Sequence, residues 1–232
     1  LFATVLAVAL FGMGCASVNV TKEQLQNGLI AYYPFSGNAM DASGNGNHGE
    51  ALEGAKLTVD RHGETDRAYL FDGIKSHIHI KGSKKIEPPH GFTVSLWYYN
   101  LESREDAWAG FIAKNGPGQA AGFRLWTQVS RRIFLTVWGK NGVLNTTLGP
   151  DEHSENLFLI DKKWTQLVFT FDGVKKWSFY QNGIFVETLE REIEVSWNPG
   201  YPINLNIGMS HRSFFEGMLD DIRFYDRDLS TE

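Results

Sequence analysis

Apolar and polar residues alternate with a period of two along most of the chain after Leu29. Residues 91–100, GFTVSLWYYN, show the pattern most clearly. Successive side chains of a β-strand point to opposite faces, so one alternate set is buried and the other faces outward. The expected inward set is Phe92, Val94, Leu96 and Tyr98, and the expected outward set is Thr93, Ser95, Trp97 and Tyr99. The alternation predicts strands, because no stretch of the chain sustains a helical period.

Short runs of this kind recur along the chain and are closed by glycine-rich turns. The expected strands lie at 29–35, 67–73, 76–82, 91–100, 122–127, 133–139, 163–173, 175–188, 203–209 and 217–226. Asn182-Gly183 lies between two apolar runs, and this dipeptide favours the type I′ turn of a β-hairpin. Many short strands joined by tight turns predict an all-β protein, an antiparallel sandwich or jelly roll. Because no linker or repeat divides residues 25–232, we expect them to form one domain.

The first 15 residues, LFATVLAVALFGMGC, form an apolar run that ends at the only cysteine, Cys15. Such a run is too short to span a bilayer comfortably and is typical of the hydrophobic region of a secretory signal. With Gly14 before Cys15, it predicts a bacterial lipobox whose thiol carries a lipid, although Gly12 stands where leucine is usual. The alternative is ordinary secretion, with Cys15 removed or incidental. We therefore expect a secreted or cell-surface bacterial lipoprotein, held to a membrane only through Cys15, and we leave residues 1–24 out of the fold.

The charge distribution argues against a nucleic-acid partner. The formal net charge is −5, and acidic and basic residues are interspersed. A nucleic-acid-binding surface instead concentrates Lys and Arg on one face. The pairs Lys84-Lys85 and Arg131-Arg132 are too short to form such a surface.

Residues 41–51, DASGNGNHGEA, fit two ligand-binding loops without completing either. Gly44, Gly46 and Gly49 match the G-x-G-x-x-G pattern of dinucleotide-binding loops, but no amphipathic helix follows them, as that site requires. An EF-hand requires a bidentate Glu at its twelfth position, where this chain has Leu52. The stretch therefore predicts a loop after the first strand, in which the three glycines permit turns with positive φ.

Six segments occur in an order that is similar to a known family. They are GLIAYYPFSGNAMDASGNGNHG, RAYLFDG, FTVSLWYY, WTQLVFTFDG, FYQNG and FEGMLDDIRFYDRDLS. Over residues 28–232 the chain resembles the laminin-G-like jelly roll of the concanavalin A-like lectin/glucanase superfamily. The resemblance implies two curved antiparallel sheets, often in secreted or surface proteins that bind glycans or other proteins. It also implies a further helical stretch after the Leu-Ser motif, so we expect the C-terminus to be shortened.

The resemblance further implies a candidate calcium site, in which the early loop meets a late acidic strand. Asp41 and Asn45 would supply ligands from the loop, joined by Asp220 or Asp221. Ca²⁺ prefers oxygen ligands of these kinds. Because Asp220 and Asp221 are neighbours on a strand, we expect only one of them to face inward. The alternative is that the Asp and Asn side chains only brace the turns through hydrogen bonds to the backbone.

Five side chains are candidates for a sugar-binding surface. They are Trp97, Tyr99, Arg124, Trp126 and, on a strand that is apolar on both faces, Trp138. An aromatic ring packs on the apolar face of a sugar, and a guanidinium group donates hydrogen bonds to its hydroxyls. If their strands adjoin, these residues line one concave face. The alternative is that some of the rings pack beneath long loops.

The chain has one imitation of a catalytic motif. Glucanases of the same superfamily place E-x-D-x-E on one strand, and Glu190, Glu192 and Glu194 alternate in the same way. The central residue is Glu instead of Asp, and Arg191 separates the first two, so charges on a solvated strand edge explain the stretch better. We therefore expect a non-catalytic binding module for carbohydrate, with a glycan or a cell-surface or matrix protein as partner and Ca²⁺ as a candidate cofactor. The alternatives are a glycoside hydrolase or lyase, and a structural or adhesive domain of a longer surface protein.

Overall fold

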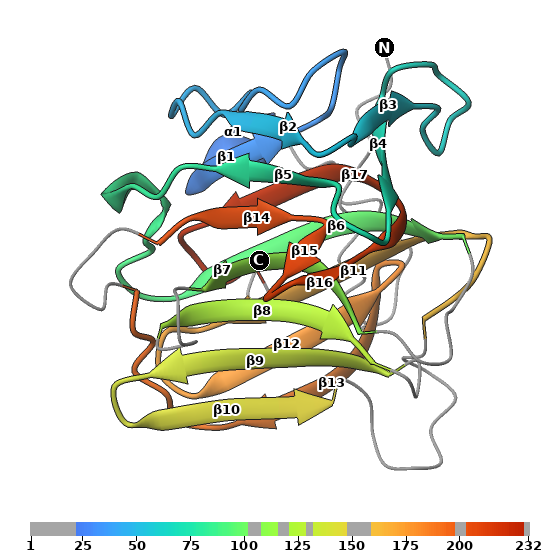
Figure 1. The fold of residues 1–232 in the computed structure, drawn as a ribbon. Helices are drawn as coiled ribbons and strands as arrows, with labels where there is room; N and C mark the ends of the chain where they lie inside the picture. The colour runs from blue at the N-terminus through green and yellow to red at the C-terminus, as the bar shows by residue number, and fades with distance from the viewer. Residues whose placement is uncertain are drawn as a thin grey trace, which may run out of the picture.

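The computed structural model describes residues 22–101, 108–115, 121–128, 132–147, 159–197 and 203–229. The predicted signal segment, the lipidation site Cys15 and the end of the chain after residue 229 lie outside the described residues. Within the described part, two β-sheets pack face to face (Figure 1), which confirms the predicted all-β, two-sheet jelly-roll sandwich. No helix in these segments is long and apolar enough to cross a membrane.

One layer, sheet A, contains eight strands among the described residues. They are β1 (Leu29–Tyr33), β3 (Lys56–Thr58), β4 (Ala68–Asp72), β6 (Phe92–Asn100), β11 (Trp164–Phe171), β12 (Lys176–Gln181), β13 (Ile184–Glu190) and β17 (Glu216–Tyr225). Their order is β13-β12-β11-β6-β17-β4-β3, and β1 pairs with the C-terminal half of β17. The long β17 therefore lies between β6 on one side and β4 and β1 on the other, and it joins the two ends of the chain in one sheet.

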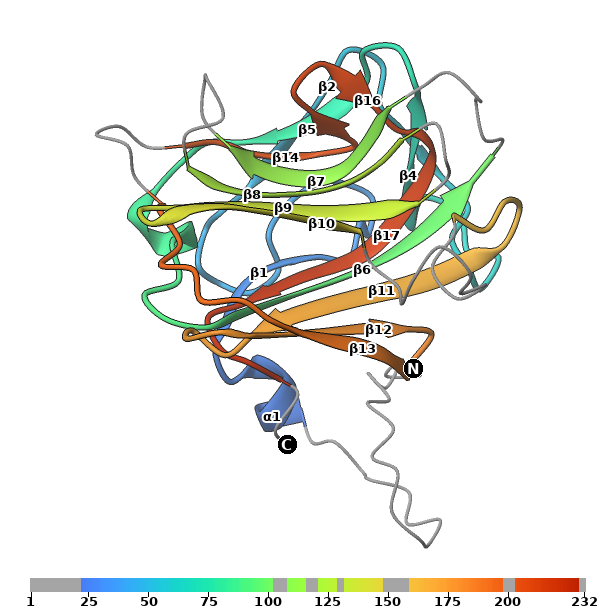
Figure 2. The same cartoon turned by 90° about the horizontal axis from the view of Figure 1, so that it is seen from below.

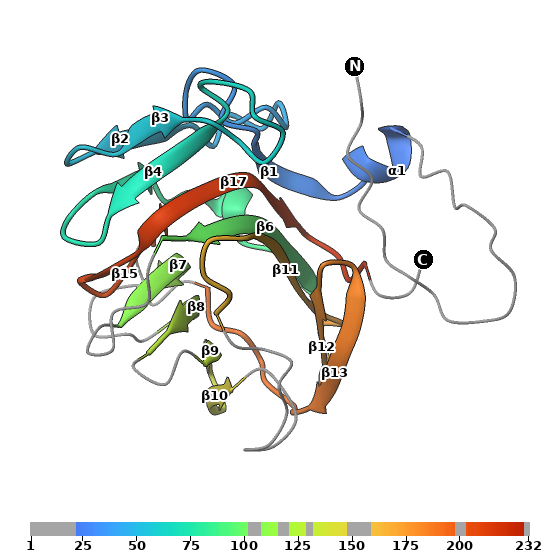
Figure 3. The ribbon, with the colours of Figure 1, turned by 90° about the vertical axis from the view of Figure 1, so that its right-hand side faces the viewer.

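The other layer, sheet B, contains nine strands in the described segments. They are β2 (Gly49–Leu52), β5 (His77–Ile80), β7 (Ala109–Asn115), β8 (Gly122–Thr127), β9 (Ile133–Gly139), β10 (Gly142–Thr147), β14 (Leu205–Ile207), β15 (Met209–Ser210) and β16 (Ser213–Phe214). Their order is β10-β9-β8-β7-β14-β5-β2, with the short β16 beside β7 and β15. Figures 2 and 3 show the two layers from their sides.

The core lies between the inner faces of the two sheets. The ring of Phe92 on β6 lies 5.6 Å from that of Phe123 on β8, and the ring of Tyr98 lies 5.3 Å from that of Phe111 on β7. All four side chains are buried in one hydrophobic cluster. The predicted inward set of β6 is therefore confirmed, and the remaining alternate positions define two outer faces, one on each sheet.

Every predicted strand contains an observed one. The predicted hairpin is also confirmed, because Asn182 and Gly183 have φ of 51° and 76° and Gln181 pairs with Ile184 across the turn. Both central residues thus have the positive φ that a type I′ turn requires.

Several elements were not predicted. They are β2, β3, β7, β10, β15, β16, the helix α1 (Lys22–Gln26) and the 3-10 turn η1 (Lys84–Ile86). β7 escapes the pattern because its pairing shifts between Gly110 and Ile112 and because Lys114 is fully buried at an inward position. The Lys114 ammonium donates to the carbonyl of Ile203 at 2.7 Å, and burial lowers the pKa of Lys114 to about 8.

Candidate functional site

The outer face of sheet B carries a line of mostly polar residues that crosses its strands. Strand register places them in the order His79 (β5), Asn206 (β14), Ala113 (β7), Arg124 (β8), Thr136 (β9) and Asn145 (β10). We call these six residues the polar row. Neighbouring strands lie about 4.8 Å apart, so the row extends for about 24 Å. Figure 2 shows β7 and β8 bowed toward sheet A, so the face that carries the row is concave.

Aromatic rings lie beside the polar row. Trp126 stacks on Phe134 with ring centroids 4.7 Å apart. Trp126 also contacts Trp108, and the centroids of these two rings are 5.2 Å apart. Trp126 and Phe134 are buried, whereas Trp108 is 51% exposed. Trp108 therefore presents an accessible ring that is held against a packed aromatic pair.

Arg124 places a cation within the polar row. Its guanidinium carbon lies 4.3 Å from the ring centroid of Trp126 and 5.5 Å from that of Trp138. Its Nε donates to the Thr136 hydroxyl at 3.3 Å, and the same hydroxyl oxygen accepts from the Trp126 indole at 3.0 Å and donates to Asn145 at 2.7 Å. Burial lowers the pKa of Arg124 from its ordinary value. Stacking and hydrogen bonds therefore hold a partly desolvated cation in one orientation.

The five residues predicted to form one sugar-binding face lie on two different faces. Arg124, Trp126 and Trp138 are on the outer face of sheet B, whereas Trp97 and Tyr99 are on the outer face of sheet A. Parity within a strand tells inward from outward but does not tell which sheet the strand joins, so the expected single group is corrected to two.

The rings differ in exposure as well as in position. Trp126 and Trp138 are only 5% and 7% exposed, so these two rings pack away from solvent. On sheet A, Trp97 lies under the Arg61 guanidinium at 4.9 Å and Tyr99 packs against Trp164. Neither of these two rings adjoins the polar row.

The accessible members of the site were not predicted from the sequence. Trp108 directly precedes β7, a strand that the alternation did not reveal. Asn145 lies on β10, which was also missed, and Asn206 and His79 come from strands far away in the sequence, where they make a 3.3 Å side-chain contact. No sequence pattern marks Trp108, because its exposure and its contact with Trp126 depend on the tertiary structure.

The predicted calcium ligand Asp41 braces its own loop. Its Oδ1 accepts the backbone N–H groups of Tyr32 and Ser43, and its Oδ2 accepts that of Asn47, each at 2.9 Å. The Asn45 amide donates to the carbonyls of Leu29 and Ile30 at 2.8 and 3.0 Å. Both side chains therefore tie residues 41–47 to the start of β1 through backbone groups.

The glycines of this loop act in two ways. Gly44 and Gly46 have φ of 92° and 76°, as predicted. Gly49 begins β2 without a positive φ, so that part of the prediction is wrong. A Cβ at Gly49 would lie 2.7 Å from the Ile78 side chain and 2.9 Å from the Ala39 carbonyl, so close packing is what requires glycine there.

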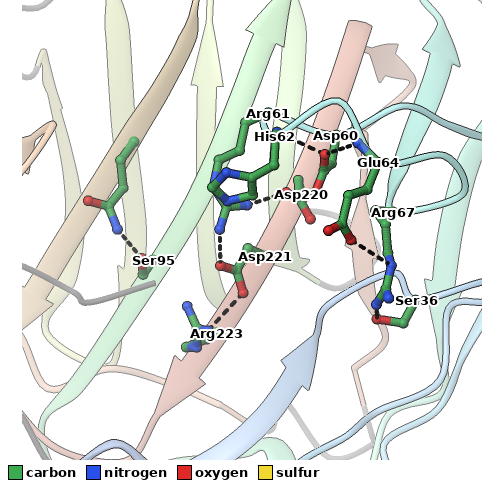
Figure 4. A network of polar contacts seen from close by, with 11 residues as sticks. Ser36, Asp60, Arg61, His62, Glu64, Arg67, Ser95, Asp220, Asp221 and Arg223 are labelled. Carbon is green, nitrogen blue, oxygen red and sulfur yellow. Dashed lines mark hydrogen bonds and ion pairs between the residues drawn. The ribbon is translucent and has the colours of Figure 1, made fainter. Parts of the chain in front are cut away.

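Asp220 and Asp221 belong to a network of ion pairs on the outer face of sheet A (Figure 4). Arg61, from the segment between β3 and β4, pairs with both carboxylates, at 2.8 Å for Asp221, and Arg223 pairs with Asp221 at 2.8 Å. The expected alternation of the two aspartates fails, because both carboxylates turn to the same arginine on the outer face where the pairing of β17 with β6 shifts and Asp221 takes a φ of 52°. Burial raises the pKa of Asp220 to about 7, although Arg61 acts to lower it.

The predicted calcium ligands therefore already have partners within the protein: backbone amides for Asp41, and arginines for Asp220 and Asp221. Within the residues that the structure describes, no group of three or more His, Cys, Asp and Glu side chains is placed to hold a metal ion. Calcium binding at residues 41–49 stays a prediction.

The glutamates that imitate a catalytic motif do not share a strand. β13 ends at Glu190, and Glu192 and Glu194 follow it outside any strand. All three are exposed, and Glu190 pairs with Lys175 whereas Glu194 pairs with Lys140. The geometry thus gives them no shared face on which two carboxylates could act on one bond.

Comparison with known proteins defines the family of the chain. Residues 72–232 match a laminin G-type family model described as the concanavalin A-like lectin/glucanases superfamily, and the chain belongs to this family. The sequence matches no curated protein.

Solved structures of low sequence identity share the fold. The binding domain of Paraclostridial Mosquitocidal Protein 1 aligns over 89% of this chain and 50% of its own length, with a TM-score of 0.70 and 14% identity. The binding domain of botulinum neurotoxin DC in complex with SialylT aligns over 88% and 49%, with a TM-score of 0.66 and 13% identity. This chain thus spans about half the length of these toxin domains. Domain 4 of AbnA, an extracellular arabinanase from Geobacillus stearothermophilus in complex with arabinotriose, aligns over 87% and 93%, with a TM-score of 0.61 and 19% identity.

Proposed function

We propose that this chain is a non-catalytic carbohydrate-binding module and that the concave outer face of sheet B holds the ligand. The observation that carries the proposal is the half-exposed Trp108 ring beside the polar row. A sugar ring has an apolar face that packs on an aromatic ring, and hydroxyl groups at its edge that require hydrogen-bond partners. Trp108 supplies the ring, and Arg124, Asn145 and Asn206 supply donors and acceptors on the same side of the sheet.

The shape of the site suits an oligosaccharide. The polar row crosses six strands, so its groups recur at the strand spacing over about 24 Å. A chain of sugars laid across the strands would meet several of these groups in succession. This arrangement supports a glycan chain as the ligand in preference to a single sugar.

The comparisons support a binding module in a general way. The arabinanase domain, which this chain matches over nearly its whole length, is described with arabinotriose bound, and one of the toxin domains is described with SialylT. Because identity to these structures is below 20%, their likeness concerns the fold, and the proposal for this chain rests on its own side chains.

Affinity electrophoresis tests the proposal directly. The protein is run through gels that contain arabinan, galactan or polygalacturonate, and slower migration than in a gel without polysaccharide reports binding. Trp108→Ala is expected to weaken retention at least about tenfold, as the loss of an aromatic contact at the centre of a site does. Phe185→Ala is the matched control, because Phe185 is 48% exposed and lies on β13 of the other sheet. Equal retention of Trp108→Ala and the unchanged protein would contradict the proposed site.

The apolar run that ends at Cys15 supports a lipid-anchored, cell-surface location for this module. Labelling with a tagged fatty acid in bacteria tests this part. The label is expected on the unchanged protein and not on Cys15→Ala, which should appear in the soluble fraction. Membrane retention of Cys15→Ala would contradict the anchor.

A further inference from the structure

We infer that the ligand of the concave face is an acidic glycan, and that Arg124 binds a carboxylate group of one of its sugars. The inference rests on the proposed function and names the chemical class of its ligand. It follows from the orientation of Arg124, from the charges that surround it and from the groups on either side of it.

The orientation leaves one edge of the guanidinium group open. Its flat face packs on Trp126, with Trp138 nearby, and its Nε donates to Thr136. No further hydrogen bond or ion pair joins Arg124 to the described part of the chain. The two Nη groups therefore remain for a ligand. They form a planar fork that matches the two oxygens of a carboxylate.

The surrounding charges favour an anion. Although the protein carries a formal net charge of −5, the described outward residues of β7 to β10 include no carboxylate. Along the strand register, the nearest described acid is Glu50 on β2, beyond β14 and β5. Its backbone is the strand partner of His79. A partly buried cation that has no counter-ion among the described residues gains more from an anionic ligand than an exposed, already paired arginine does.

The neighbours of Arg124 along the polar row have short side chains. Ala113 lies on one side of Arg124 and Thr136 on the other, and both are small. Farther along, Asn145 on one side and Asn206 on the other offer amide groups for hydroxyls of adjacent sugars. The centre of the row is thus suited to a carboxylate and its flanks to neutral hydroxyls.

Paired polymers provide the test. Binding is measured by calorimetry to polygalacturonate and to the same polymer after its carboxyl groups have been reduced, which gives a neutral chain with the same linkage. Sialyllactose forms a third arm and distinguishes a sialic acid from a uronic acid as the source of the carboxylate. The unchanged protein is expected to bind one of the acidic ligands about 10- to 100-fold more tightly than the neutral polymer. Raising the salt concentration should reduce this preference.

Variants assign the preference to Arg124. Arg124→Gln is expected to abolish the preference for the acidic ligand, so that it loses much more affinity for that ligand than for the neutral polymer. Arg124→Lys should fall between, since it keeps the charge but loses the planar fork. Arg67→Gln is the matched control, because Arg67 is exposed, pairs with Glu64 and lies between β3 and β4. It should bind like the unchanged protein.

Each other outcome is decisive. If the unchanged protein prefers neither polygalacturonate nor sialyllactose to the neutral polymer, the acidic ligand is overturned and the carbohydrate-binding module stands. If Arg124→Gln loses affinity equally for the acidic and the neutral ligand, with an unchanged melting temperature, Arg124 shapes the site without recognising charge. Failure to bind any of the three ligands or the neutral polysaccharides above would overturn both proposals.

Discussion

Arg124 and Trp126 stand two positions apart on β8, and the guanidinium carbon of Arg124 lies 4.3 Å from the centroid of the Trp126 ring. Residues at this spacing share one face of a strand, so the contact follows from local geometry once the strand forms. The same face of β9 supplies Phe134 beneath Trp126 and Trp138 near Arg124. The concave face therefore joins a cation to a packed aromatic surface, whose buried and exposed members should respond differently to substitution.

Trp126 and Trp108 are in contact but differ in burial, and their substitution should separate stability from binding. Trp126→Ala is expected to lower the free energy of unfolding by about 3–5 kcal/mol, because it leaves a cavity against Phe134. Trp108→Ala should cost about 1 kcal/mol or less, since the side chain is half exposed. Urea denaturation followed by fluorescence measures both values. A small cost for Trp126→Ala would show that this ring is a ligand contact and not a structural one.

Asp41 should stabilise the loop without any metal. Asp41→Ala removes the acceptor of three backbone N–H groups and is expected to lower the free energy of unfolding by about 2–4 kcal/mol in excess chelator. Thermal melts of the unchanged protein and of Asp41→Ala, in calcium and in excess chelator, test the predicted metal site. A calcium-dependent rise in the melting temperature of the unchanged protein that Asp41→Ala lacks would establish calcium at this loop. An equal cost in both conditions would leave Asp41 as a brace.

Asp220 should make stability fall as the pH rises. Its pKa is about 7 in the folded protein and near 4 in an unfolded chain, so the folded state holds the proton more tightly. The resulting stabilisation is complete below about pH 4 and is lost as the pH rises to about 7, a change on the order of 2–4 kcal/mol.

Asp220→Asn provides the measurement. Melting temperatures from pH 4 to pH 8 should fall more steeply for the unchanged protein than for this variant. Asp226→Asn, at an exposed position, is the control and should follow the unchanged protein. Parallel curves for Asp220→Asn and the unchanged protein would show that Arg61 keeps Asp220 ionised throughout this range.

Two glycines with similar φ angles allow the cost of backbone strain to be measured apart from the cost of a steric clash. Gly122 and Gly54 have φ of +83° and +91°, but a Cβ at Gly122 would lie 1.7 Å from the Lys114 carbonyl, whereas Gly54 has open space around it. Gly54→Ala is expected to cost about 1–2 kcal/mol from the backbone conformation alone. Gly122→Ala should cost clearly more, because β8 must move away from β7. Thermal melts of the two variants make the comparison, and equal costs would mean that β7 and β8 adjust freely.

The parts of the fold that sequence reasoning recovered are those governed by neighbouring residues. The direction of each side chain on β6 follows from the pleat of the backbone, and the turn at Asn182-Gly183 follows from the positive φ that these residues accept. β7 was missed because a shift in pairing at Gly110 breaks its alternation and Lys114 points inward. A buried lysine at such a position requires a hydrogen-bond acceptor, and the carbonyl of Ile203 in another segment accepts a hydrogen bond from its ammonium group.

The candidate site was recovered only in part for a related reason. Arg124 and Trp126 were identified because both are outward on one strand, but Trp97 was grouped with them although its strand belongs to the other sheet. Asp220 or Asp221 was expected to join Asp41 and Asn45 in a calcium site, and the structure pairs both aspartates with Arg61, a residue to which no pattern in the sequence pointed.

The sequence by itself therefore determined the class of fold, the strands that alternate, the tight turns and the inward or outward direction of most side chains. Only the tertiary structure decided which strands adjoin, and so which outward residues share a face. Local patterns depend on the backbone of a few consecutive residues. Sheet membership and register depend on pairings such as Trp97 with Asp220 and Arg124 with Thr136, which the packing of the whole core selects. The polar row exists only as a consequence of those pairings, and for that reason no single segment of the chain reveals it.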